Sequence, residues 1–104
     1  MSDYIVVKTF CKDEVIANKI VDELLNKKLV SGSQISRIHS KYWWNNKICE
    51  CDEFKLEFRS KKILFDEIQN VVKAVHDYEL PEITYYDICG GNEEIFEWIS
   101  KNTK

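Results

Sequence analysis

Residues 47–60, KICECDEFKLEFRS, decide the fold because their second half alternates between apolar and charged side chains. In an extended strand successive side chains point to opposite faces, so Phe54, Leu56 and Phe58 share one face. The opposite face carries the charged residues Glu53, Lys55, Glu57 and Arg59. This pattern predicts a β-strand that covers a core on one side only.

Residues 34–44, QISRIHSKYWW, are predicted to form the partner strand of a hairpin. The connection is Asn45-Asn46, and asparagine adopts positive φ more readily than other non-glycine residues, as a two-residue turn requires. Such a turn pairs Trp44 with Lys47. Each strand of the hairpin is longer than usual, so we expect it to reach beyond its own core.

This register predicts which side chains are neighbours across the hairpin. The pairs are Tyr42 with Cys49 and Ser40 with Cys51 on one face, and His39 with Asp52 and Lys41 with Glu50 on the other. We expect the charged pairs to fix the register, each contributing about 0.2–1 kcal/mol. The spacing from Ile35 to Ile38 predicts a bulge in the first strand.

The remaining segments complete an α+β pattern. Apolar residues at helical or strand spacing predict strands at 3–10 and 82–88 and helices at 12–29, 61–76 and 93–102. The order β-α-β-β-α-β is that of a ferredoxin-like sandwich, with two helices on one face of a four-stranded antiparallel sheet and here an extra C-terminal helix. A chain of 104 residues has room for one such domain, residues 1–104.

Composition argues against several classes of function. A net charge of −3 does not suit nucleic acid, whose backbone demands a basic surface. The first residues, MSDYIVVKTF, have no basic start and an apolar run too short for a signal peptide, so we expect none, and no stretch approaches the roughly 20 apolar residues of a membrane span. We therefore expect a cytoplasmic protein with no nucleic-acid or membrane partner and with its four cysteines reduced. No phosphate loop, nucleophile elbow or HExxH sequence is present, so we expect no enzyme.

Residues 76–82, HDYELPE, surround the only proline of the chain. Proline disfavours helix at the residue before it, so the segment is explained as a corner between a helix and a strand. The same corner gathers nitrogen and oxygen donors that suit zinc, copper or nickel: His76, Tyr78, Glu79 and Glu82. The alternative hypothesis is therefore a metal site in which His76 and Glu82 are the ligands.

Cys49 and Cys51 lie two residues apart on a predicted strand and so share a face. A pair of thiolates suits a soft ion such as Cu(I), Zn or Cd. Zinc usually takes four ligands, however, and a free cysteine also packs as a small apolar residue. We favour packing, with metal binding as the alternative. We expect Cys11 to fill the N-cap of the first helix; the alternative is a reactive thiol whose pKa is lowered by the nearby helix start.

Tyr42, Trp43 and Trp44 precede the hairpin turn. Adjacent aromatic side chains left in water would promote aggregation, so we expect a neighbouring subunit to cover them. The alternative is a ligand that stacks on Trp43, in a cleft shared with Tyr78 and Glu79.

Several segments together resemble the CutA family of divalent-cation tolerance proteins. They are KDEVIANKIVDELLNKKLV (12–30), YWWNNKI (42–48), HDYELPE (76–82) and EEIFEWI (93–99), in the family's order and nearly its spacing. The resemblance implies a ferredoxin-like subunit in a homotrimer built like the PII signalling proteins, in which the hairpin of residues 34–60 engages its neighbours. It also implies binding of divalent metals, copper above all, and no catalytic reaction.

The chain departs from the family's pattern in two places, of which the first is Lys55 and Glu57, where relatives usually carry apolar residues; we therefore expect a more polar subunit contact. The second is the segment before the second strand. CutA proteins typically carry Ala-Ala-Cys-Val-Asn at the start of the second strand, and that cysteine is a proposed copper ligand. Here the segment is Val30-Ser31-Gly32-Ser33-Gln34, with Gly32 or Ser33 in its place. Neither offers a ligand for a soft metal. We therefore expect a homotrimer that binds copper or zinc weakly; the alternative is a PII-like trimer that binds a small ligand between subunits and signals to a partner protein.

Overall fold

The computed structural model describes residues 2–104, and its elements follow the predicted order. The strands are β1 (Tyr4–Cys11), β2 (Gly32–Trp44), β3 (Lys47–Lys61) and β4 (Ile83–Asp87). The helices are α1 (Glu14–Asn26), α2 (Phe65–Val75), which a short 3₁₀ turn (Lys62–Leu64) precedes, and α3 (Glu93–Asn102). The boundaries differ from the prediction by a few residues, mostly at the ends of α1 and α2.

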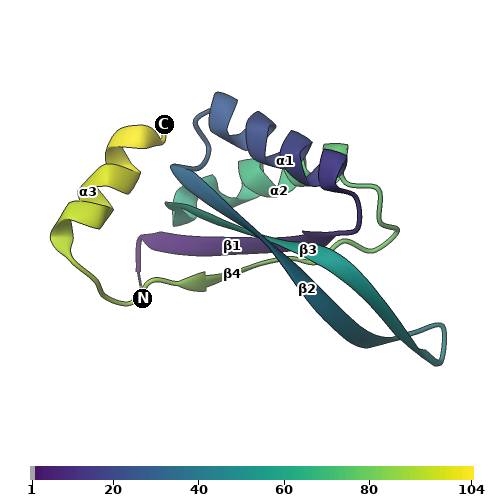
Figure 1. Cartoon of the computed structure of the whole chain (residues 1–104). Coiled ribbons are helices and arrows are strands. Elements are labelled where there is room, and N and C mark those ends of the chain that lie inside the picture. Colours follow the sequence, from purple (N-terminus) through teal and green to yellow (C-terminus); the bar gives the residue numbers. More distant parts are fainter. Residues whose placement is uncertain (1) are drawn as a thin grey trace.

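The strands form one antiparallel sheet in the order β2-β3-β1-β4. Helices α1 and α2 lie together on one face of this sheet, and α3 lies at the opposite end from the hairpin tip (Figure 1). This arrangement confirms the ferredoxin-like fold with an added C-terminal helix. Among residues 2–104, no helix is long and apolar enough to cross a membrane.

The half of the sheet in which β3 pairs with β1, residues 54–61 of β3, is called the base below. Its helix-facing side forms the core, where Leu56 and Phe58 are completely buried together with residues of α1 and α2. Burial of each such side chain stabilises the fold by about 1.5–3 kcal/mol. The alternation predicted for β3 is therefore confirmed in the base.

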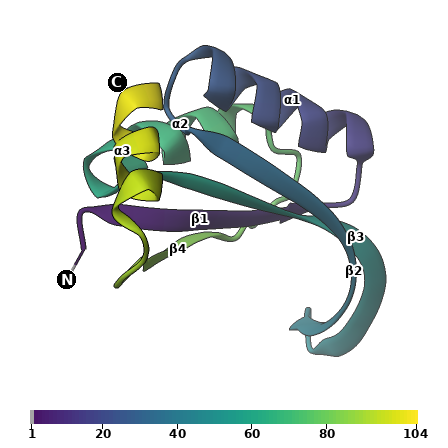
Figure 2. The same ribbon diagram turned by 60° about the vertical axis from the view of Figure 1, so that its left-hand side comes forward.

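Beyond the base, β2 and β3 continue as a two-stranded ribbon. Strand β1 ends at Cys11, opposite Phe54, so residues 38–53 pair only with one another. This segment is called the arm below, and it curves away from the sheet (Figure 2). Asn45 and Asn46 both have positive φ, as the predicted turn requires.

The predicted register of the hairpin is confirmed, from Trp44 opposite Lys47 to Gly32 opposite Arg59. The predicted bulge is wrong because this pairing is continuous. Ile35 and Ile38 simply point to opposite faces of the strand.

The predicted role of Cys11 is also wrong. Cys11 is the last residue of β1 and is completely buried in the core. The N-cap of α1 is Asp13, whose carboxylate accepts a hydrogen bond of 2.7 Å from the backbone N–H of Val15. A carboxylate satisfies the free N–H groups at a helix start better than a thiol does.

Candidate functional site

The corner at residues 76–82 turns its histidine inward. The His76 side chain is completely buried, and its Nε2 lies 2.6 Å from the carbonyl oxygen of Phe10. Its Nδ1 accepts a hydrogen bond of 3.1 Å from the backbone N–H of Tyr78, so Nε2 must carry the proton that is donated to Phe10. Both ring nitrogens are therefore engaged, and His76 offers no lone pair to a metal while these bonds are made.

The glutamates of the corner face the solvent instead. Glu79 and Glu82 are exposed. The Glu82 carboxylate accepts a hydrogen bond of 3.0 Å from the hydroxyl of Thr84 and lies 3.7 Å from the ammonium of Lys8. The structure therefore does not bring His76 and Glu82 together as ligands of one ion, as the metal hypothesis for this corner requires.

A carboxylate that the sequence analysis missed lies beside this corner. Glu53, in the arm, is only 8% exposed, and it accepts a hydrogen bond of 2.9 Å from the hydroxyl of Tyr78. Burial, reinforced by this bond, raises the pKa of Tyr78 well above its ordinary value, so its hydroxyl stays protonated as a donor. The predicted register did indicate that Glu53 differs from the other acidic residues of the arm. Glu53 faces Ile38 across the hairpin, whereas Glu50 and Asp52 face basic residues.

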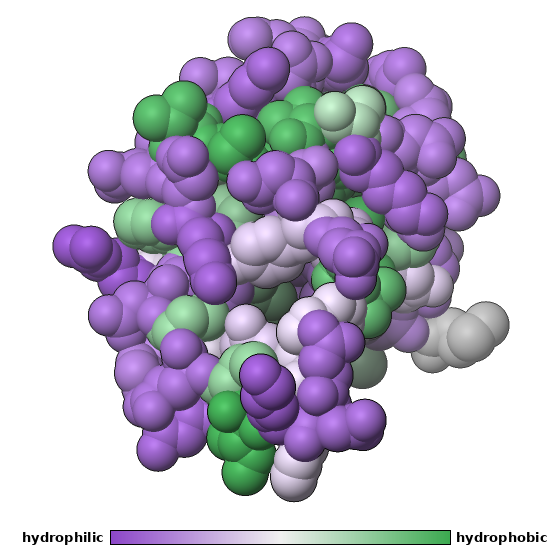
Figure 3. All heavy atoms as spheres, turned by 90° about the vertical axis from the view of Figure 1, so that its right-hand side faces the viewer, coloured by the Kyte–Doolittle hydropathy of each residue, from purple (hydrophilic) through white to green (hydrophobic). Residues whose placement is uncertain are grey.

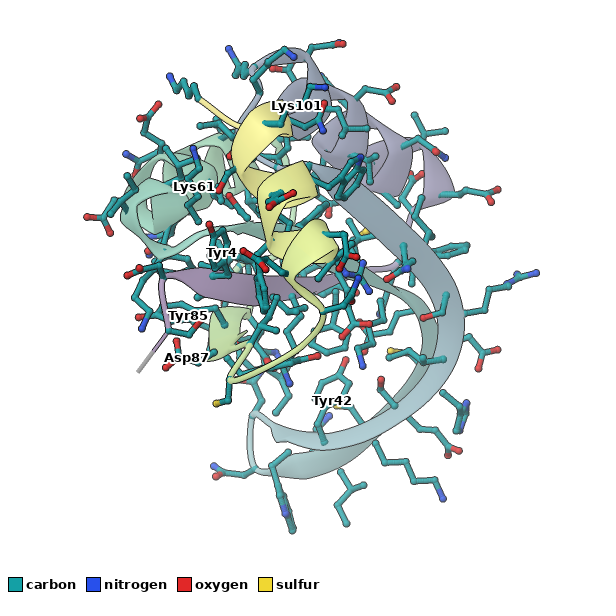
Figure 4. All side chains as sticks on the ribbon, turned by 90° about the vertical axis from the view of Figure 1, so that its left-hand side faces the viewer. Tyr4, Tyr42, Lys61, Tyr85, Asp87 and Lys101 are labelled. Carbon is teal, nitrogen blue, oxygen red and sulfur yellow. The ribbon has the colours of Figure 1, made fainter. Side chains whose placement is uncertain are left out.

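The two thiols of the arm lie on the same face as Glu53. Cys49 and Cys51 are free and partly buried, and the Tyr42 hydroxyl lies 3.7 Å from the Cys51 sulfur. This contact is the main reason why the pKa of Tyr42 is raised. In Figure 4, Tyr42 points into the inner side of the curved arm.

Glu53 therefore connects the two sites that the sequence predicted separately. Cys51 and Glu53 are two residues apart on one face of β3, and Tyr78 reaches Glu53 from the corner. Donor atoms thus continue from the thiols of the arm to the edge of the corner. Within residues 2–104, however, no group of three or more His, Cys, Asp or Glu side chains is arranged to hold a metal ion.

The other face of the arm carries the predicted charged pairs. The Nδ1 of His39 lies 2.6 Å from Asp52, and its Nε2 lies 2.5 Å from Glu50. These two carboxylates raise the pKa of His39, whose side chain is exposed. They approach opposite edges of the ring, so they do not converge with one nitrogen on a common ion.

Trp43 lies on this second face, opposite Ile48 near the tip, and is 72% exposed. Viewed from the side of the arm, small hydrophobic groups lie among mostly hydrophilic side chains (Figure 3).

The corner itself borders a groove of about 530 Å³. Its lining is Gln69, Lys73, His76, Tyr78, Glu79, Leu80, Pro81 and Ile83. Within one chain, the predicted cleft therefore contains Tyr78 and Glu79 but not Trp43.

The start of β2, where the segment departs from the family's pattern, packs against α3. A side chain at Gly32 would meet the indole ring of Trp98, which comes within 3.0 Å of the position of a Cβ atom. The neighbouring Ser33 hydroxyl is buried, and no hydrogen-bond partner for it lies among the described residues. An aromatic side chain of α3 thus fills the space next to the place where a family cysteine is expected.

Comparison with known proteins gives one consistent result. The CutA1 divalent ion tolerance protein family matches residues 5–102. The divalent-cation tolerance protein CutA of Pyrococcus horikoshii is 30% identical over 100 residues, which cover 96% of this chain and 98% of the relative. The chloroplastic protein CutA 1 of Oryza sativa is 30% identical over 101 residues, covering 96% of this chain and 57% of that protein. The solved structure of the periplasmic divalent cation tolerance protein CutA from Archaeoglobus fulgidus has a TM-score of 0.94 at 30% identity, covering 97% and 99% of the two chains.

Proposed function

The chain belongs to the CutA1 family of divalent ion tolerance proteins, and on that premise we propose that it binds a divalent metal, copper or zinc, weakly and without catalysis, as a homotrimer. The observation that carries the proposal is the match to this family over residues 5–102. The family's name describes tolerance to ions rather than a reaction, which supports a binding role.

In this proposal the ligands at the corner are carboxylates. Glu79 and Glu82 face the solvent, whereas the imidazole of His76 is committed to Phe10 and Tyr78. His76 then fixes the shape of the corner instead of binding the ion. Two exposed carboxylates without an imidazole make an incomplete site for zinc, which prefers four ligands, so binding is weak.

The homotrimer is supported by the surface that the fold leaves uncovered. β2 is an edge strand of 13 residues, and a long edge offers unpaired backbone groups to another chain. The arm also exposes aromatic side chains, with Tyr42 and Trp44 on one face and Trp43 on the other. We propose that neighbouring subunits cover both the edge and these aromatic rings, through the hairpin of residues 34–60.

We also propose a cytoplasmic location, because a chain of 104 residues is large enough to fold without disulfides, as proteins of a reducing compartment do. Relatives differ in this respect: those from A. fulgidus and O. sativa are named periplasmic and chloroplastic. Fractionation of the source cells, with an antibody against the chain, tests this part of the proposal.

A second candidate function is the binding of a small ligand by a PII-like trimer. The groove at the corner favours it, because Leu80 exposes an apolar side chain there next to Tyr78 and the cationic Lys73. That combination suits a small organic anion with an apolar part.

The proposal is tested with the reduced chain by sedimentation equilibrium and by calorimetric titration with Zn(II), which has no redox chemistry. We expect a trimer that binds Zn(II), with binding lost in Glu79→Gln/Glu82→Gln. The double variant Glu93→Gln/Glu97→Gln on α3 removes the same charge from exposed positions and should bind as the wild type does. A trimer that takes up no Zn(II) would contradict the metal proposal and leave the small-ligand candidate.

A further inference from the structure

We propose that Cys49 and Cys51 form a second metal site, on the arm, that binds one soft monovalent cation, Cu(I), between two thiolates. This site is separate from the carboxylates of the corner. It can be tested separately from the divalent-ion proposal, because it uses other residues and another class of ion.

The spacing of the two thiols suits a shared ion. Both cysteines lie in the continuous part of β3, so their Cα atoms are separated by two residue rises, about 6.7 Å. A metal–sulfur bond is about 2.3 Å long, so two thiolates that share an ion linearly lie about 4.6 Å apart. Two thiols on the same face of a strand would therefore need to approach each other by only about 2 Å, relative to their Cα atoms, to share one ion.

The same spacing is poor for a disulfide between the two cysteines. Disulfides join Cα atoms that are usually 4.4–6.8 Å apart, most often about 5.5–6 Å, and the sulfurs must come within about 2.05 Å. Cys49 and Cys51 are at the outer limit of that range because an extended strand holds them apart. The strand therefore favours an ion between the thiols over a bond between them.

The number of donors selects the kind of ion. Thiolates prefer soft metals such as Cu(I) and zinc, but a zinc site takes four ligands. The nearest carboxylate on this face, Glu53, already accepts the hydroxyl of Tyr78, and no cluster of three ligating side chains exists among residues 2–104. Cu(I) is satisfied by two thiolates, so it is the ion that this donor set completes.

The other cysteines of the chain do not compete for the ion. Burial, with help from nearby carboxylates, raises the pKa of Cys11 to about 11, which disfavours its thiolate. Cys89 is exposed and lies after β4, away from the arm, where no second thiol accompanies it. Cys89 is therefore a matched control.

Each thiol releases its proton when it binds the metal. No electron is transferred, since copper is supplied as Cu(I) and the cysteines are reduced. We therefore expect two protons to be released for each ion bound, and the affinity to rise with pH.

The test is an anaerobic competition between the full, reduced chain and a coloured Cu(I) chelator, with wild type, Cys49→Ser, Cys51→Ser, the double serine variant and Cys89→Ser. We expect one Cu(I) per chain in the wild type and in Cys89→Ser. Each serine substitution on the arm should weaken binding by more than about 100-fold, beyond the cost of losing an outer partner of a metal site. Binding in the double variant within threefold of the wild type would overturn the proposal, as would an equal loss in Cys89→Ser.

Alkylation of the wild type gives a second readout that needs no variant. Compared with the metal-free chain, bound Cu(I) should lower the reactivity of Cys49 and Cys51 toward iodoacetamide and leave that of Cys89 unchanged, as peptide mass spectrometry will show. Reactivities of Cys49 and Cys51 that are the same with and without one equivalent of Cu(I) would contradict the site, even if a serine variant failed to fold.

Discussion

Strand β3 runs through both the base and the arm. Its side chains alternate between the same two faces in both regions, but those of the helix-facing side are buried in the base and exposed in the arm. In the base, the helix-facing positions of β3 are apolar and buried beneath α1 and α2, as Leu56 and Phe58 are. In the arm, the same face continues through Asp52 and Glu50 to Ile48, and no helix covers it. Alternation along a strand therefore fixes the face of each side chain, but the element that lies above decides whether it stabilises the fold or is free to bind.

The difference in stability between base and arm is tested most strongly by truncating one apolar side chain in each region. Leu56 is completely buried and Ile48 is 67% exposed, although both point to the same face of β3. Leu56→Ala should lower the free energy of unfolding by about 2–5 kcal/mol, because it leaves a cavity in the core. Ile48→Ala should change it by less than about 0.5 kcal/mol, since most of that side chain is already in water.

Urea denaturation of both variants under conditions that keep the chain monomeric measures this difference. Similar losses of stability for the two substitutions would mean that the arm is part of the cooperative core, and the division into base and arm would then be wrong.

Local chemistry explains how much the sequence could predict. The Asn45-Asn46 turn sets the register of the whole hairpin, so the neighbours of Cys49 and Cys51 followed from counting residues away from it. Helix and strand periods likewise gave the order of elements and therefore the fold.

The contacts at the corner could not be predicted by counting residues from a turn. The Nε2 of His76 bonds to the carbonyl of Phe10, which is 66 residues earlier in the chain. Tyr78 covers Glu53 from a loop 25 residues away, so a residue on the charged face of a strand became buried. Sequence spacing says which way a side chain points but not which distant loop lies over it.

The hydrogen bond between Tyr78 and Glu53, where the arm meets the base, gives the second prediction. Tyr78→Phe removes the donor to Glu53, a nearly buried carboxylate, and should cost about 1–3 kcal/mol of stability because that charge loses its partner. Tyr86→Phe is the matched control, since its hydroxyl donates a bond of the same 2.9 Å length to Glu57 on the open face of the sheet. We expect the control to cost less than about 1 kcal/mol.

Thermal unfolding of both phenylalanine variants checks the prediction. Adding Glu53→Gln to Tyr78→Phe should recover part of the loss, because an amide tolerates burial better than an unpaired carboxylate. A loss in Tyr78→Phe no larger than that in Tyr86→Phe would show that the Tyr78 ring, which phenylalanine keeps, rather than its hydrogen bond, stabilises this contact.

The smallest expected effect is a pH dependence of the stability of the folded arm. Glu50 and Asp52 raise the pKa of His39 above its ordinary value of 6.5, so the folded arm holds the proton more tightly than the unfolded chain does. The resulting stabilisation is fully present below about pH 6.5 and is lost as the pH rises through the raised pKa of the folded state. NMR titration of the imidazole should show that raised value.

His39→Gln is the control for this effect. It should abolish the pH-dependent change in arm protection, measured by hydrogen exchange of the Tyr42 and Trp44 amides between pH 6 and 8.5. A titration of His39 at or below 6.5 would contradict the role assigned to the two carboxylates.

The central claim is that the base holds the fold and the arm carries assembly and Cu(I) binding. Deleting residues 40–44 and 47–51 joins His39 and Asp52, which already face each other, through Asn45-Asn46. Native mass spectrometry of this variant beside the full chain, both reduced and supplied with Cu(I), tests the claim most directly. The account predicts a metal-bound trimer for the full chain and a folded, metal-free monomer for the shortened one. A shortened chain that still forms a copper-bound trimer, or one that no longer folds, would contradict it.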